Sequence, residues 1–177
     1  MLRNRTIKRK LRLESLESRC LLAGNVTVKV AGGNLFITGD NNDNVVLVAG
    51  TGTSGQYLVE GLTDSAGLPT NIRYNGTNNS SVIVSGVKHS INVDLKGGDD
   101  AFGLTNANVK NDVNIEMGAG NDLVAIGSSS SVGIDTIATL GPVIIHGTLN
   151  VHTSGGNDDV LIGAELFHAE WHNAAVA

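Results

Sequence analysis

The chain has 177 residues, a length that suits one domain with a buried core and not two independent domains. Glycine is abundant at 23 residues and aromatic residues make up 3% of the chain, so short strands joined by tight turns are favoured over an α/β interior. Residues 1–24 carry seven Lys/Arg against two Glu, a net charge of +5, and the remainder carries five Lys/Arg against fifteen Asp/Glu, a net charge of −10. An acidic body repels nucleic acid and attracts cations, so no nucleic-acid partner is expected.

Two further features of the composition narrow the class of protein. No apolar run reaches the length of roughly 18 residues that predicts a membrane-spanning helix, so no membrane-spanning segment is expected. Cys20 is the single cysteine and therefore excludes a disulfide within the chain.

The first segment, residues 1–24, is basic and leucine-rich and differs from everything after it. We expect a targeting-like leader that is either disordered or a short amphipathic helix over about residues 11–22. A secretory signal would need an apolar core of about 7 to 15 residues, which this segment lacks.

Within this leader, LESLESRCLLAG at residues 13–24 resembles the LEPR-XLL motif that begins many large planctomycete proteins thought to be surface proteins or exported. The matching positions are Leu13, Glu14, Leu16, Glu17, Arg19, Leu21 and Leu22, and Ser18 stands where that family usually has proline. The resemblance implies an extracellular or cell-surface location, and it implies nothing about chemistry.

The next segment predicts an antiparallel hairpin. Two alternating runs, VTVKVA and LFIT, flank Gly32-Gly33-Asn34. Leu35, Ile37, Val46 and Val48 also fit the apolar positions of the repeat described next, with Asp43 and Asn44 in its turn, so residues from Asn34 are expected to form a first, degenerate coil. Residues 62–80 are rich in turn formers and are predicted to be irregular, and the run SVIVSG that follows is predicted to be a strand.

Three later segments share one pattern: INVDLKGGDDAFGL from Ile91, VNIEMGAGNDLVAI from Val113 and LNVHTSGGNDDVLI from Leu149. Each has an alternating strand, a Gly/Asn/Asp turn and a second apolar strand. The first interval is 22 residues, too short for a crossover helix, so a coil of three short parallel strands is favoured. The second interval is 36 residues. It is either one coil with a 14-residue insertion near GSSSSVGIDTIATL or two coils of about 18 residues. We favour the insertion, because it aligns Val109 with Ile145 and Asn111 with Gly147.

The pattern predicts an all-β fold, a right-handed parallel β-helix or closely related β-solenoid over residues 25–165, entered through the N-terminal hairpin. A β-sandwich is the alternative, although it would not explain the common register of the three repeats. Residues 166–177 are predicted to be either a C-terminal capping helix, with Leu166, Phe167 and Trp171 covering the last apolar layer, or a frayed tail.

The acidic turns GGDD, GAGND and GGNDD resemble single units of the GGxGxDxUx calcium repeat of RTX type. That resemblance implies a calcium cofactor shared between neighbouring turns, because calcium takes about six to eight oxygen ligands. The predicted metal ligands are Asp99, Asp100, Asn121, Asp122, Asn157, Asp158 and Asp159. True RTX arrays repeat every nine residues, whereas these turns recur every 22, so ordinary polar turns of a β-helix are an equal alternative.

The positions Asn92, Asn114 and Asn150 also recur and predict a stacked ladder of amides that supports the fold. We therefore expect a non-enzymatic extracellular or cell-surface structural protein, adhesin-like, whose partners are cell-surface components or other copies of the chain. The alternative is a carbohydrate-active β-helix enzyme of polysaccharide lyase type, which would need a groove holding Lys96 or Arg73 against Asp99, Asp100 and Asp122.

Overall fold

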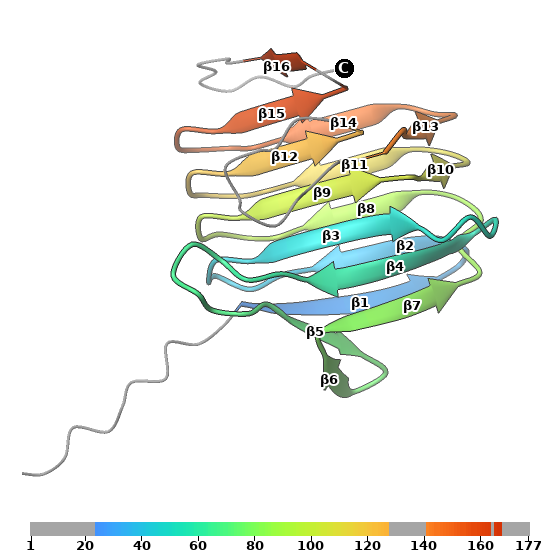
Figure 1. Cartoon of the computed structure of the whole chain (residues 1–177), viewed down its shortest axis with the longest axis horizontal. Helices are drawn as coiled ribbons and strands as arrows, with labels where there is room; N and C mark the ends of the chain where they lie inside the picture. The colour runs from blue at the N-terminus through green and yellow to red at the C-terminus, as the bar shows by residue number, and fades with distance from the viewer. Residues whose placement is uncertain (1–23, 128–140, 164, 168–177) are drawn as a thin grey trace, which may run out of the picture.

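The computed structural model describes residues 24–127, 141–163 and 165–167, and this part of the chain is all-β, without a helix. Two seven-stranded sheets, named here sheet A and sheet B, face each other across a common core (Figure 1). Across sheet A the strands are β14 (Leu149–His152), β11 (Val113–Glu116), β8 (Ile91–Asp94), β2 (Asn34–Thr38), β1 (Asn25–Ala31), β5 (Asn71–Tyr74) and β6 (Thr77–Asn79). Across sheet B they are β16 (Glu165–Phe167), β15 (Asp159–Ile162), β12 (Leu123–Ile126), β9 (Ala101–Thr105), β3 (Val45–Gly50), β4 (Gln56–Gly61) and β7 (Ser81–Ser85).

The three predicted repeats are parallel neighbours. β8 pairs with β11 and β11 pairs with β14, with Ile91, Val113 and Leu149 opposite one another. The second strand of each repeat behaves in the same way, because β12 pairs in parallel with both β9 and β15. The predicted register of the three repeats is therefore confirmed.

The longer interval contains one insertion, as predicted. Ile126 still pairs with Leu104 at the 22-residue offset, whereas Ile144 pairs with Asn108 at an offset of 36. The latter pair belongs to a short parallel sheet of β10 (Asn108–Val109) and β13 (Ile144–Ile145). The extra 14 residues thus lie between these two pairs, in a stretch of which residues 128–140 fall outside the described part.

The N-terminal hairpin and the degenerate first coil are both confirmed. β1 and β2 pair antiparallel around Gly32 and Gly33, whose φ angles of 55° and 79° suit the tight turn that joins twisted strands. β2 then pairs in parallel with β8 and β3 with β9, so residues from Asn34 onward form a coil of the repeat.

Two predictions about the ends of the stack of coils are corrected. The supposedly irregular stretch 62–80 contains the hairpin β5–β6, because Ile72 is fully buried and β5 extends sheet A beside β1. Leu166 and Phe167 lie in β16, which pairs antiparallel with β15, and not in a capping helix. The free edge of the last coil offers backbone partners that a helix could not use. Residues 168–177, with Trp171, and the leader up to residue 23 lie outside the described part.

The core forms where inward-facing residues of the two sheets meet. Alternate residues of β8 and β11 are buried, and their neighbours face outward, as the period of two predicts. The largest fully buried side chains include Phe102, Leu35, Leu104 and Met117. In every coil, a turn carries the chain from sheet A to sheet B over one side of this core, and these are the acidic turns.

Candidate functional site

The acidic turns stack directly on one another. Gly98, Gly120 and Gly156 occupy equivalent places and have φ angles of 116°, 147° and 139°, respectively. A Cβ on Gly120 would overlap the carbonyl oxygen of Gly98, and one on Gly156 would overlap the carbonyl oxygen of Gly120. Glycine is therefore required both for the backbone angle and for the close approach between coils.

An inner column of side chains follows the stack along the edge of the core. Its members are Asn44, Asp100, Asp122 and Asp158. Each aspartate accepts a hydrogen bond at Oδ1 from the backbone N–H of the member before it. The donors Asn44, Asp100 and Asp122 lie at 2.7, 3.0 and 3.0 Å, respectively. The carboxylates thereby link consecutive coils in one direction.

An outer column runs beside it at the surface, and its members are Asp43, Asp99, Asn121 and Asn157. Here the direction is reversed, because each Oδ1 accepts from the backbone N–H of the following member. The donors are Asp99, Asn121 and Asn157, at 2.8, 2.8 and 3.0 Å. Aspartate and asparagine are interchangeable in this role, since both offer the same acceptor oxygen.

The inner column is electrostatically unusual. Asp100 and Asp122 are each only 2% exposed, and their burial raises the pKa of Asp100 to about 7 and that of Asp122 to about 6. Repulsion between neighbouring carboxylates acts in the same direction. The Oδ2 atoms of Asp100, Asp122 and Asp158 and the Oδ1 atom of Asn44 are buried without a hydrogen-bond partner. Four side-chain oxygens along the inner column therefore lack the hydrogen-bond partners that buried polar atoms normally have.

The backbone of these turns is used differently from the calcium-coordinating backbone that the RTX resemblance implies. The turn carbonyls that would coordinate the ion are engaged between coils: Ala119 O accepts from Gly98 N at 3.0 Å, and Gly155 O accepts from Gly120 N at 2.9 Å. Among the described residues, no group of three or more His, Cys, Asp or Glu side chains is arranged to hold a metal ion. The buried side-chain oxygens without a hydrogen-bond partner are those of the inner column, one in each coil, whereas calcium takes about six to eight oxygen ligands.

The predicted ligands divide into three groups. Asp100, Asp122 and Asp158 belong to the inner column, and Asp99, Asn121 and Asn157 belong to the outer column. Asp159 belongs to neither, because it begins β15 in register with Leu123 and so lies on the strand after the turn.

The list of candidate ligands missed Asp43 and Asn44, which complete the two columns at the first coil. Asp43 accepts from the N–H of Asp99, and Asn44 donates its N–H to Asp100. The signal for both was the register of the degenerate first coil, in which they occupy the turn positions.

The asparagine ladder is confirmed on the outer face of sheet A. Asn92, Asn114 and Asn150 lie opposite one another, and the Nδ2 of each later residue donates to the Oδ1 of the one before it, at 3.0 and 2.8 Å. These bonds join three coils and leave the amides occupied with each other.

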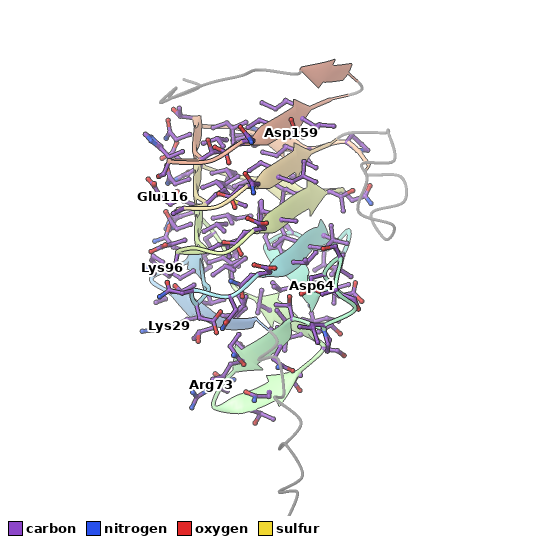
Figure 2. The ribbon with its side chains drawn as sticks, turned by 90° about the vertical axis from the view of Figure 1, so that its left-hand side faces the viewer. Lys29, Asp64, Arg73, Lys96, Glu116 and Asp159 are labelled. Carbon is purple, nitrogen blue, oxygen red and sulfur yellow. The ribbon has the colours of Figure 1, made fainter. Side chains whose placement is uncertain are left out.

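The basic side chains considered for a lyase site lie apart from the aspartates. Lys96 Nζ pairs with the exposed carboxylate of Asp94. Arg73 lies on β5, three strands from β8 in sheet A, or about 14 Å away at the usual strand spacing. Figure 2 shows Lys96 level with the middle coils and Arg73 near the N-terminal end of the stack. Since Asp100 and Asp122 are buried, no groove among the described residues brings these groups together.

Fold and site together define an all-β protein whose repeated polar residues bind the chain to itself. Residues 8–26 match the family model named Planctomycete extracellular, which supports an extracellular location. The comparisons with curated proteins and with solved structures found no match. Within the described residues, no helix is long and apolar enough to cross a membrane.

Proposed function

We propose that this chain is a non-enzymatic, adhesin-like structural protein of the cell surface, built as a right-handed parallel β-helix. The supporting observation is the use of its repeated polar residues. The inner column, the outer column and the asparagine ladder all form hydrogen bonds to neighbouring coils. Repeated polar residues that are engaged in this way suit a scaffold better than a reaction centre.

The β-helix class rests on the connections between strands. The chain passes from β8 in sheet A through β9 in sheet B and β10, and then returns to sheet A as β11, parallel to β8. A connection between parallel strands of one sheet is right-handed in about 98% of cases. We infer the right-handedness of the coil from that rule, and the name parallel β-helix from the path of the chain between the two sheets.

Calcium binding is a second candidate, supported by the unpartnered oxygens of the inner column. Asp100 Oδ2 and Asp122 Oδ2 belong to adjacent coils and are buried without compensation. A divalent cation between coils would neutralise their charge and satisfy these atoms. It would act as a stabiliser of the stack, without a part in any reaction.

The scaffold proposal is tested by location and by activity. The tagged chain is expected at the cell surface or in the medium, and a variant without residues 1–24 is expected to remain inside. Retention of the intact chain in the cytoplasm would contradict the proposal. The purified protein is then incubated with acidic polysaccharides, and formation of unsaturated sugar products is followed. Product formation that Lys96→Ala abolishes would instead support the carbohydrate-active alternative.

A further inference from the structure

Among the described residues, β7 is the last strand of sheet B. It pairs antiparallel with β4, and no strand follows it in the sheet (Figure 1). Ser81, Ile83 and Ser85 are exposed, whereas Val84 is fully buried in the core. The strand is therefore anchored on its inner face, and no strand among the described residues pairs with its outer edge, although β5 of sheet A lies close to it.

The alternation of an antiparallel ladder identifies which backbone groups are free. Gly61 N donates to Ser80 O at 2.8 Å, so Ser80 and every second residue after it turn their N–H and C=O groups toward β4. The groups of Ser81, Ile83 and Ser85 consequently point away from the sheet. Within the described part of the chain, no backbone hydrogen bond satisfies them.

The sequence of β7, Ser-Val-Ile-Val-Ser, reads the same in both directions. An antiparallel pairing with a second copy, centred on Ile83, would place Ser81 opposite Ser85 of the second copy and the two Ile83 residues opposite each other. The outward N–H and C=O groups of the two strands then meet as donor and acceptor along the whole strand.

Charge and shape also fit a second copy. The strand has no charged residue and no proline, the features that commonly protect exposed edges. Ile83 is 60% exposed and pairs with Leu58 on the outer face of sheet B, so the two-fold pairing covers apolar surface. Glu60 pairs with Ser81 at one end of the strand, and the exposed Lys88 follows Ser85 at the other. The two-fold axis brings the acidic end of one copy to the basic end of the other.

From this geometry we propose that two copies of the chain dimerise through β7, paired antiparallel about Ile83, so that their B sheets become one continuous sheet. A single strand pair is a small interface, and the dimer is therefore weak and concentration-dependent. The partner is the chain itself, and the dimer does not depend on calcium or on any activity.

Sedimentation equilibrium in EDTA, from micromolar to millimolar protein, tests the dimer. The wild type is expected to shift from monomer to dimer, and Ile83→Lys is expected to raise the dissociation constant by roughly tenfold or more, because like charges then face each other at the axis. Ile144→Lys is the matched control, since Ile144 is 54% exposed but lies on β13. Melting curves establish that both variants fold. A wild type that remains monomeric throughout overturns the proposal. That result is expected if the natural partner of β7 is a strand from another protein. A dimer that Ile83→Lys leaves unchanged overturns the proposal as well.

Cysteine cross-linking in a Cys20→Ser background tests the register. Two copies of Ile83→Cys would have Cα atoms about 5.5 Å apart, within disulfide range, and are expected to cross-link on mild oxidation. Two copies of Ser85→Cys would lie about 14 Å apart and are expected not to cross-link. A mixture of Ser81→Cys and Ser85→Cys chains should cross-link as mixed dimers. Equal cross-linking of Ile83→Cys and Ser85→Cys alone would refute the two-fold pairing at β7.

Discussion

Raising the pH from about 5 to about 8 is expected to destabilise the protein in the presence of EDTA. The pKa values of Asp100, about 7, and of Asp122, about 6, both lie above the ordinary value of 3.8, chiefly because the groups are buried. A carboxyl group whose pKa is higher in the folded chain than in the unfolded chain holds its proton more tightly when folded. The stability that it contributes is fully present below pH 3.8 and is lost as the pH rises through 6 to 7. The carboxylates of Asp43, Asp99 and Asp158 face these two groups and add repulsion when they are charged.

The size of this effect follows from the two shifts. One pKa unit corresponds to about 1.4 kcal/mol of free energy of unfolding, so the unscreened shifts amount to several kcal/mol. Solvent beside the turns screens part of this, and we expect a net loss of about 3 kcal/mol. For a chain of this length, that loss lowers the melting temperature by about 10 °C.

Thermal melting followed by circular dichroism at a series of pH values measures the effect. The variant Asp122→Asn keeps an oxygen that accepts the N–H of Asp100 but cannot ionise, so its melting temperature should depend less on pH, and the dependence that remains should come from Asp100. Asp99→Asn is the control, because Asp99 accepts the N–H of Asn121 in the next coil but is exposed. A wild-type melting temperature that is constant or rises over this range would refute the reasoning. The same conclusion would follow if Asp99→Asn flattened the profile as much as Asp122→Asn.

Repeating the melts in millimolar calcium separates the two roles considered for the inner column. If calcium binds there, it should restore the stability lost near pH 8 and have little effect near pH 5, where Asp100 and Asp122 are largely protonated. An unchanged melting temperature near pH 8 would exclude calcium as a stabiliser and leave the hydrogen-bonded column intact.

Four further substitutions test the stack itself by chemical denaturation. Gly120→Ala should cost about 3 kcal/mol or more, because its φ of 147° and the carbonyl of Gly98 exclude a Cβ, whereas Gly155→Ala in an equivalent turn meets open space and should cost well under 1 kcal/mol. Similar losses for the two variants would contradict the close stacking of the turns. Asn114→Ala removes two ladder bonds and should cost about 1 to 2 kcal/mol; an unchanged midpoint would mean that the ladder contributes nothing. Phe102→Ala leaves a cavity in the core and should cost about 3 to 5 kcal/mol, and a loss below about 1 kcal/mol would place this side chain outside a packed core.

The repeat in the sequence was sufficient to predict the central part of the fold. Apolar residues two apart fix which face of each strand is buried, and a one-residue slip would expose that whole face. The common register of Ile91, Val113 and Leu149 therefore had one consistent solution, which the parallel pairing confirms. The same argument located the insertion and the first coil.

The ends of the stack could not be predicted in the same way, because they do not follow the repeat. The hairpin β5–β6 lies in a stretch rich in turn formers, and burial of Ile72 beside β1 outweighs those local preferences. Likewise, Leu166 and Phe167 have helix-compatible neighbours in the sequence but join the open edge of β15 as a strand. Both outcomes depend on which backbone groups the finished coils leave unpaired.

For the acidic turns, the sequence by itself determined that glycine, asparagine and aspartate recur at fixed places, and hence that the turns stack. Only the tertiary structure decided what each oxygen does. Adjacent residues such as Asp99 and Asp100 look alike in sequence, yet one is exposed and accepts from the next coil, and the other is buried and accepts from the coil before it. The physical reason is that hydrogen-bond direction and desolvation depend on the neighbouring coil, which lies 22 or more residues away along the chain.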